Sequence, residues 1–336
     1  MRAAVLENNK FVIKEVEKPS LDEYKTGAIV KVIGCGLCGS DIVKINNGKA
    51  KDGDVLGHEV VGEIVEINSE TNFEIGDKIV LGHHVPCFNC HYCWNGSYSM
   101  CRHFKSTNII PGGFAEYIYV SEEHLSKTVF RVNLSLSDIE ASFFEPLGCC
   151  IRAIQRADIN LHTKNLVIGL GSVGILMGGA LKAFGYEAYG CDLKKERVDL
   201  SLGYGFEKSF LLEDENEVIK QMKEYAPIGF DTIFLTAGAT KALNLALKSS
   251  RDGAKIVVFS SIKDNYGFLN NHIYYRELTV MGSYSPSPMD LEDSIKFIEQ
   301  GKVKVSGLSK VYSLENLNEA VSDTLSNKIM KAFIKL

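Results

Sequence analysis

Four cysteines stand close together in the first third of the chain, with the spacing Cys-x2-Cys-x2-Cys-x7-Cys. They are Cys87, Cys90, Cys93 and Cys101. Thiolates three residues apart on a tight turn can converge on one ion, and four thiolates complete the closed tetrahedral shell of a structural Zn²⁺. Three histidines lie nearby, at His83, His84 and His91, but four sulfurs suffice. We therefore expect a structural zinc lobe over residues 83–103.

A second set of residues offers ligands of mixed type, at Cys38, His58, Glu59 and Glu145. Each alone is weak evidence, because a lone cysteine or histidine is more often a core residue than a ligand. Together they supply a thiolate, an imidazole and carboxylates. Such a set leaves one coordination position open for water or a substrate oxygen, which is what a catalytic zinc requires.

A glycine signature follows a short apolar run at residues 165–168 and opens a stretch with helical spacing. Its residues are Gly169, Leu170, Gly171, Ser172, Val173 and Gly174. In the pattern G-x-G-x-x-G the first glycine permits a tight turn, and the second lets a pyrophosphate approach the backbone. The third glycine lets the helix pack on the strand, and the helix N-terminus faces the phosphate charge. The signature predicts a dinucleotide site.

Asp192 stands at the end of the next predicted strand, where a carboxylate can accept hydrogen bonds from a ribose diol. The same carboxylate would repel a 2′-phosphate, so NAD is favoured over NADP. Lys194, Lys195 and Arg197 are close enough in sequence to keep NADP open, and we include Arg197 among the cofactor-binding candidates. A solvated strand-end carboxylate is the alternative interpretation of Asp192.

Two kinds of framework must position these groups. Up to about Phe144, short β-branched runs separated by glycine predict a small, irregular β domain. The clearest runs are Ala28–Ile33, Val60–Ile67, Lys78–Leu81 and Glu116–Val120.

From about Gly148 to Gly282, buried-strand runs alternate with helical spacing, which predicts a parallel sheet covered on both faces. The expected strands are 165–168, 187–191, 231–235 and 255–259, and the expected helices 175–184, 194–202 and 241–248. The last fifty residues contain a helix at about 290–300 and an apolar run at 332–336. The sequence leaves open whether this tail forms a third domain or returns to the first.

The composition limits the classes of function. A net charge of −5 over 336 residues gives no electrostatic reason to bind nucleic acid, which counts against a zinc ribbon on DNA or RNA. No apolar run approaches the roughly 20 residues needed to span a bilayer. The N-terminal residues reach a charge too early for a signal peptide, so we expect a cytoplasmic protein. Nine cysteines, an odd number, are there better explained by metal ligation than by disulfides.

The order and spacing of these motifs resemble the zinc-dependent medium-chain alcohol and polyol dehydrogenases, in the branch of sorbitol and threonine dehydrogenases. The shared steps are Cys-Gly-Ser-Asp, Gly-His-Glu, the four-cysteine lobe, Glu-Pro-Leu and the glycine signature. The resemblance covers essentially the whole chain. It implies a GroES-like catalytic domain at 1–147 and 287–336, a Rossmann NAD-binding domain at 148–286, and an active site in the cleft between them.

Carried over to this chain, the resemblance implies that Cys38 and His58 hold the catalytic zinc. The third protein ligand stays open. In sorbitol-dehydrogenase-like relatives the position of Glu59 is the direct ligand and that of Glu145 holds the bound water, whereas in other branches Glu145 itself binds. Asp41 matches a carboxylate that orients the ligands.

The resemblance also assigns Ser40 as the proton-relay hydroxyl. Two departures accompany this assignment. The histidine that usually ends the relay is Val43 here, so the proton needs another exit. The Arg-Tyr pair of sorbitol dehydrogenases is absent around Ser285, which weakens sorbitol itself as the substrate.

The function expected from the resemblance is oxidation of a secondary alcohol to a ketone with NAD, on a polyol, cyclitol or sugar-like substrate. It implies two Zn²⁺ per subunit and a homodimer or homotetramer. The alternatives are an amino-alcohol enzyme of the L-threonine 3-dehydrogenase type and a zinc- or NAD-binding protein that has lost catalysis. The retained set of catalytic-zinc ligands argues against the last of these.

Overall fold

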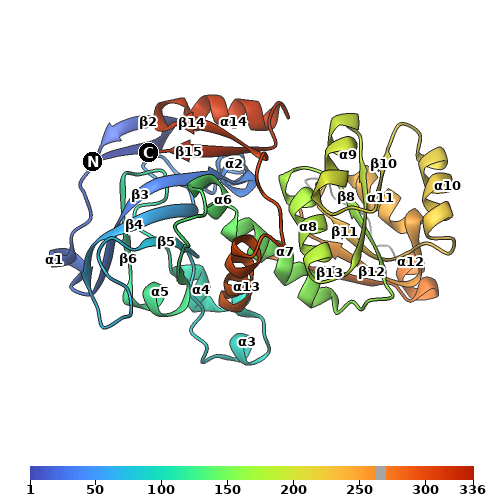
Figure 1. The fold of residues 1–336 in the computed structure, drawn as a ribbon, viewed down its shortest axis with the longest axis horizontal. Coiled ribbons are helices and arrows are strands. Elements are labelled where there is room, and N and C mark those ends of the chain that lie inside the picture. The colour runs from blue at the N-terminus through green and yellow to red at the C-terminus, as the bar shows by residue number, and fades with distance from the viewer. Residues whose placement is uncertain (262–269) are drawn as a thin grey trace. The chain divides into compact units, whose positions relative to one another are not determined.

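The computed structural model describes residues 1–261 and 270–336, and the chain divides into two compact units (Figure 1). Unit 1 comprises residues 1–145, 287–299 and 305–336, and unit 2 comprises residues 146–286 and 300–304. Within the described residues, no helix has both the length and the apolar character needed to cross a bilayer.

Unit 1 is built on a seven-stranded sheet in the order β14-β15-β3-β4-β5-β7, with β6 also paired to β3, and on a separate β1-β2 hairpin. All of its pairs are antiparallel except β14 with β15. The bounds are β1 Arg2–Glu7, β2 Lys10–Glu15, β3 Gly27–Leu37, β4 Glu59–Asn68, β5 Lys78–Leu81, β6 Tyr117–Val120, β7 Val129–Arg131, β14 Ser309–Ser313 and β15 Lys331–Lys335.

The long strand β3 is the centre of this sheet, because it pairs with β4, β6 and β15. Its alternating apolar side chains, among them Val30 and Val32, lie in the main core of the unit. The C-terminal strand β15 runs antiparallel to β3, with Ala332 opposite Leu37. The tail of the chain therefore belongs to the sheet of unit 1, a point that the residue pattern alone left open and for which the resemblance implied a return to the first domain.

Helices of unit 1 are short and connect or cover the strands. Their bounds are α1 Leu21–Tyr24, α2 Gly39–Asn46, α3 His91–Trp94, α4 Arg102–Ser106, α5 Glu122–Lys127, α6 Asp138–Ala141, α13 Pro288–Glu299 and α14 Leu317–Leu325, with 3-10 turns η1 Tyr98–Met100 and η3 Leu314–Asn316. Helix α13 packs Leu291 and Ile295 against Phe144 and Val61 in a second cluster of the unit.

Unit 2 is a six-stranded parallel sheet in the order β10-β9-β8-β11-β12-β13. Helix α8 lies on one face, and α10 and α11 lie on the other (Figure 1). The strands are β8 Lys164–Ile168, β9 Glu187–Asp192, β10 Lys208–Leu211, β11 Phe230–Leu235, β12 Ser250–Val258 and β13 Thr279–Gly282. The helices are α7 Phe144–Ala157, which begins in unit 1, α8 Ser172–Ala183, α9 Lys195–Ser201, η2 Leu202–Tyr204, α10 Glu215–Tyr225, α11 Thr240–Ser249 and α12 Asn270–Arg276.

The expected fold class, which combines a β-rich GroES-like unit and a parallel-sheet Rossmann unit, is confirmed. The central strands β8 and β11 carry apolar side chains on both faces, such as Leu166, Val167 and Ile233, because helices cover both faces of the sheet. This double burial produced the continuous apolar runs from which the strands were predicted.

Candidate functional site

Cys38 lies at the junction between β3 and α2, where it is the residue that caps the helix. The backbone N–H of Ser40 donates to its Sγ at 3.5 Å. The Asp41 carboxylate closes the turn by accepting a hydrogen bond from the Cys38 N–H at 3.2 Å. One tight turn thus fixes the Cys38 side chain through Ser40 and the Cys38 backbone through Asp41.

His58 and Glu59 reach Cys38 through the register of the sheet. Glu59 is the first residue of β4, and it lies opposite Gly36 of β3. Ligand atoms of Cys38, His58 and Glu59 all lie within 4.8 Å of one another. A Cβ on Gly36 would lie 1.9 Å from Glu59 Oε2, so only glycine at this position leaves room for the carboxylate.

The Asp41 carboxylate faces the His58 ring. Its Oδ1 lies 3.2 Å from His58 Nδ1, although the geometry is not that of a hydrogen bond. His58 Nε2 faces the other way, and Ser40 Oγ lies 3.5 Å from it. Burial would raise the pKa of Asp41, but the facing His58 ring outweighs that effect and holds the pKa below its usual value.

Glu59 is paired with a lysine from the far end of the chain. Lys331 Nζ lies 2.5 Å from both carboxylate oxygens and donates a hydrogen bond to Oε1. Both side chains are almost completely buried. Burial lowers the pKa of Lys331, but the Glu59 and Cys38 charges more than compensate and raise it.

The residues present fit a zinc ion. Glu59 Oε2 is buried beside a cysteine sulfur and an imidazole nitrogen, and its partner in the described structure is the ammonium group of Lys331, in an ion pair. A carboxylate oxygen has acceptor positions for a metal as well as for an ammonium group, and Zn²⁺ takes this donor set of S, N and O. Glu145 is also buried, in the first turn of α7, but it is not a member of this group of three.

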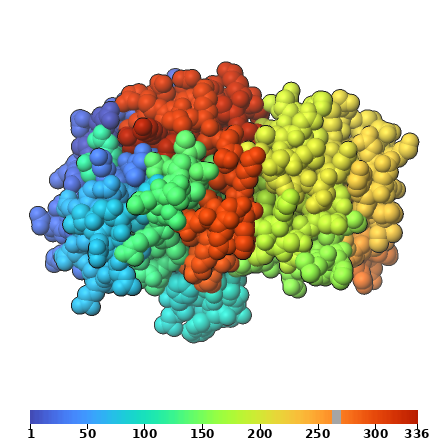
Figure 2. Space-filling model, viewed as in Figure 1, coloured from blue at the N-terminus to red at the C-terminus, as the bar shows by residue number. Residues whose placement is uncertain are grey.

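The four predicted lobe cysteines also converge. Their sulfurs are 3.5 Å apart for Cys87 and Cys101, 3.6 Å for Cys90 and Cys93, and 4.0 Å for Cys87 and Cys93. A tetrahedral Zn²⁺ with bonds of about 2.3 Å implies sulfurs separated by about 3.8 Å. The lobe carries α3 and α4 and projects from the rest of unit 1 in Figure 2.

The glycine turn connects β8 to α8 and is tightly packed at its first and last glycines. Gly169 has φ +101°, and a Cβ there would meet Ala237 at 2.8 Å. A Cβ on Gly174 would lie 1.9 Å from the carbonyl of Gly169, which explains the close contact of helix and strand. Gly171, by contrast, has open space around it, and Ser172 begins α8 directly after it. Ser172 and Val173 therefore present first-turn N–H groups at the position where a phosphate charge is favoured.

Asp192 ends β9 beside this turn and is buried. Its Oδ2 accepts a hydrogen bond from the N–H of Leu170 at 2.7 Å, and its Oδ1 accepts one from Lys194 at 2.9 Å. Arg197 Nη1 lies 3.6 Å from the same carboxylate. Because an ionised carboxylate has about four acceptor positions, these contacts leave capacity for a ribose hydroxyl.

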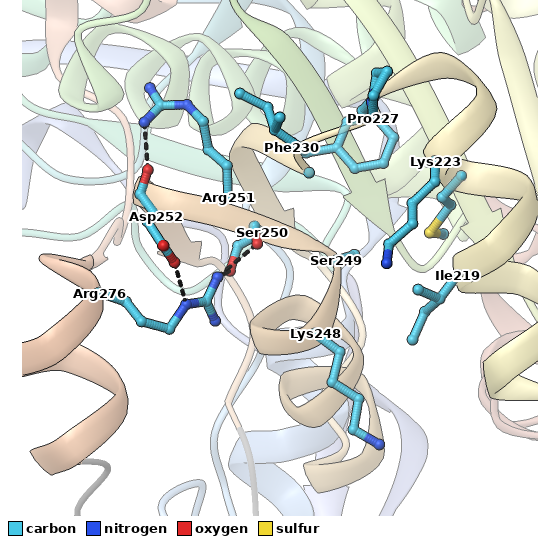
Figure 3. Close-up of a pocket in the computed structure, with 14 residues that line it drawn as sticks. Ile219, Lys223, Pro227, Phe230, Lys248, Ser249, Ser250, Arg251, Asp252 and Arg276 are labelled. Atoms are coloured by element: carbon cyan, nitrogen blue, oxygen red, sulfur yellow. Dashed lines mark hydrogen bonds and ion pairs between the residues drawn. The ribbon is translucent and has the colours of Figure 1, made fainter.

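A separate cavity of about 270 Å³ in unit 2 contains none of the predicted site residues. It lies where β11 and β12 begin, at the sheet edge opposite the glycine turn, and Figure 3 shows Arg276 reaching Asp252 and Ser250 there. Its cationic groups are largely occupied by protein partners, since Arg251 also pairs with Asp231 and Lys248 pairs with Glu215. The positive charges around this cavity therefore do not indicate an anion-binding site.

Three residues that lie next to the group of Cys38, His58 and Glu59 were not predicted from the sequence as site residues. Lys331 and Gly36 act on Glu59 through the folded sheet, and no local pattern marks either of them. His83 was noticed beside the lobe, but its ring lies against His58, with 4.6 Å between ring centroids. Burial next to that ring lowers the pKa of His83 well below its usual range.

Comparison with known proteins agrees with this geometry. Residues 24–129 match the alcohol dehydrogenase GroES-like domain, and residues 172–300 match the zinc-binding dehydrogenase domain. The chain is 29% identical to a sorbitol dehydrogenase of Bacillus subtilis, covering 99% of this chain and 97% of the relative. It is 26% identical to D-arabinitol dehydrogenase 1 of Uromyces fabae, covering 97% and 94%. The crystal structure of galactitol-1-phosphate dehydrogenase from Escherichia coli superposes with a TM-score of 0.88 at 25% identity, covering 100% of both chains.

The chain belongs to the zinc-dependent medium-chain alcohol and polyol dehydrogenase family. It is an NAD-linked, zinc-containing oxidoreductase that acts on a secondary alcohol.

Proposed function

We propose that this protein oxidises a secondary hydroxyl of a polyol, cyclitol or sugar-like substrate to the ketone, with NAD as hydride acceptor. The observation that carries the proposal is the convergence of Cys38, His58 and Glu59, whose ligand atoms all lie within 4.8 Å of one another. The relatives support the substrate class, because they are named for sorbitol, arabinitol, xylulose and idonate.

Cys38, His58 and Glu59 would hold the catalytic zinc, and Glu145 lies near enough to contribute to the charge around Lys331. Zinc in such an open site acts as a Lewis acid that lowers the pKa of a hydroxyl bound to it. Ser40 Oγ, beside His58 Nε2, is placed to take up the proton of the substrate hydroxyl. Asp41 keeps the His58 ring in the required orientation.

The absence of the usual relay histidine has a structural counterpart. Val43, which replaces that histidine, is exposed, and Ser40 is itself exposed. Ser40 can therefore pass its proton directly to water without a second side chain. This exit makes the histidine dispensable in this protein.

We further propose that the catalytic domain comprises residues 1–147 and 287–336 and that residues 148–286 bind NAD. The glycine turn would receive the pyrophosphate, and Asp192 would contact the adenosine ribose. In unit 2 the open space at Gly171 and the retained acceptor capacity of Asp192 support these roles.

Replacing Asp192 with serine is expected to raise KM for NAD about tenfold and to relax discrimination against NADP, because a charge-assisted hydrogen bond and a repulsive charge are both lost. Steady-state kinetics with both cofactors measures the effect. Asp199→Ser, which removes an exposed carboxylate of α9, serves as the control. An unchanged cofactor preference in the Asp192 variant would remove the ribose role from this residue.

We also propose two zinc ions per chain, one at the catalytic group and one in the lobe. Metal analysis of the purified protein is expected to give two equivalents, and Cys93→Ser is expected to leave one and to lower Tm, since structural zinc contributes directly to folding. A wild-type protein with a single equivalent would contradict the proposed count.

NADH formation over a panel of polyols, inositols, sugar acids, simple secondary alcohols and L-threonine tests the substrate class. We expect turnover of a polyol or cyclitol that a zinc chelator abolishes. Activity confined to L-threonine would identify the amino-alcohol alternative instead. Turnover that survives complete removal of zinc would refute the catalytic role of the metal.

We propose, in addition, that the protein forms a homodimer or homotetramer. Strand β13 is the last strand of the unit 2 sheet, and Val280 on it and Tyr284 just beyond it are exposed. An exposed apolar edge strand is a common pairing surface. Light scattering should therefore give a multiple of 37.1 kDa. A cytoplasmic location is proposed on the nine cysteines, which form no disulfide bond in the described part of the chain.

A further inference from the structure

Three imidazole rings form a row in unit 1 that begins at the candidate metal ligand His58. His83 lies next to His58, with 4.6 Å between centroids, and His84 lies next to His83, with 4.0 Å. His84 is fixed at its own end, because its Nδ1 bonds to the carbonyl of Thr107 and its ring lies against Phe104. His83 is therefore enclosed between two rings.

The backbone carbonyl of His83 takes part in a chain of hydrogen bonds with His124 and Ser121. His124 Nε2 lies 3.1 Å from the carbonyl of His83, and since a carbonyl only accepts, that nitrogen carries the proton. The other nitrogen, Nδ1, then accepts from the Ser121 hydroxyl at 2.7 Å. Burial lowers the pKa of His124, which keeps this neutral tautomer.

The ring of His83, in contrast to its backbone, has no polar partner. Within residues 1–261 and 270–336 its nitrogens make no hydrogen bond, although the side chain is only 8% exposed. His83 is also not a member of the ligand group of Cys38, His58 and Glu59. The ring nitrogens are not among the fully buried side-chain atoms without a partner in the described residues, so a molecule that enters the site can reach their unused donor and acceptor.

We propose that His83 binds a second hydroxyl group of the substrate and thereby selects polyhydroxylated substrates over simple secondary alcohols. The inference rests on the proposed function, in which the first hydroxyl is bound at the metal group. The centroid of the His83 ring lies 4.6 Å from that of His58, so this ring is within reach of a hydroxyl carried one or two carbons along a substrate held at the metal group. Because imidazole can both donate and accept, it suits a hydroxyl, which does the same.

The test compares xylitol with 2-butanol for the wild type, His83→Phe and His83→Gln. Phenylalanine keeps the ring between His58 and His84 but removes both nitrogens, so kcat/KM for xylitol is expected to fall about ten- to hundredfold, as for other sites that lose a substrate hydroxyl contact. The value for 2-butanol should stay at the wild-type level. His83→Gln, which retains a donor and an acceptor, should recover part of the loss.

A binding measurement separates this role from chemistry. Xylitol is titrated calorimetrically into zinc-loaded protein saturated with NADH, where no hydride acceptor is present. His83→Phe should weaken the Kd for xylitol by the same factor while zinc content remains unchanged. His103→Phe, a histidine of the lobe that pairs with Glu123 at the surface, is the matched control and should behave as the wild type.

The outcomes are distinct. Equal losses on xylitol and 2-butanol, or loss of zinc from His83→Phe, would mean that His83 only supports the site and would overturn the inference. Unchanged selectivity would overturn it as well, while polyol turnover by the wild type would leave the proposed function intact. A wild type that oxidises 2-butanol but no polyol would overturn both.

Discussion

Cys38→Ala is expected to reduce kcat about a thousandfold or more while NAD binding persists. The sulfur is one of three converging ligand atoms, and its loss leaves a site that cannot hold a Lewis acid for the substrate hydroxyl. The glycine turn and Asp192 belong to unit 2, so the nucleotide site is built from other residues. Steady-state kinetics, NADH fluorescence titration and metal analysis together measure the effect, and zinc should fall from two equivalents to one.

Cys35→Ala is the matched control for this variant. Cys35 lies in β3, three residues before Cys38, and is completely buried, but it is not part of the ligand group. It should retain activity and both zinc ions and lose only modest stability. His58→Ala should behave like Cys38→Ala. Wild-type rates in either ligand variant would show that the catalytic-zinc assignment is wrong.

Lys331→Met is expected to lower the free energy of unfolding of the zinc-free protein by about 3–5 kcal/mol, the range found when one partner of a buried ion pair is removed. The reason is that Glu59 would be left in the protein interior without its cation. Its side chain is completely buried, and that of Lys331 is 7% exposed. Denaturant unfolding after chelation measures the loss, which zinc should reduce because the metal supplies positive charge to the same carboxylate.

A double-mutant cycle provides the control. Glu59→Gln removes the charge that Lys331 neutralises, so combining it with Lys331→Met should restore part of the lost stability. Lys331→Arg keeps the cation and should cost less than the methionine. If the zinc-free Lys331→Met variant were as stable as the zinc-free wild type, the stability of the protein would not depend on neutralisation of Glu59 by Lys331.

The glycine turn and the zinc lobe could be predicted from the sequence because each is local. Gly169, Gly171 and Gly174 meet requirements imposed by one turn and one helix, so their spacing states the geometry directly. The lobe cysteines lie within fifteen residues, and short turns alone bring the sulfurs to 3.5–4.0 Å. The strands of unit 2 could also be predicted from the sequence, because burial on both faces of the sheet requires continuous apolar runs.

The group of Cys38, His58 and Glu59 could be predicted from the sequence only as a set of possible ligands, and its role in binding a catalytic zinc came from the family resemblance. Cys38 and Glu59 are brought together by the register of β3 against β4, and a shift of one residue would turn every side chain of the strand to the other face. Register is a property of the whole sheet, and neither residue carries a local sign of it.

The sequence by itself determined the two unit types, the nucleotide turn and the four-sulfur lobe, because these rest on periodicity and short spacing. Only the tertiary structure decided that β15 pairs with β3 and that this pairing places Lys331 next to Glu59, 272 residues away in the sequence. It also decided that His83 lies on His58. Contacts between distant segments arise from packing and strand pairing, which act after local structure has formed and leave no local pattern in the chain.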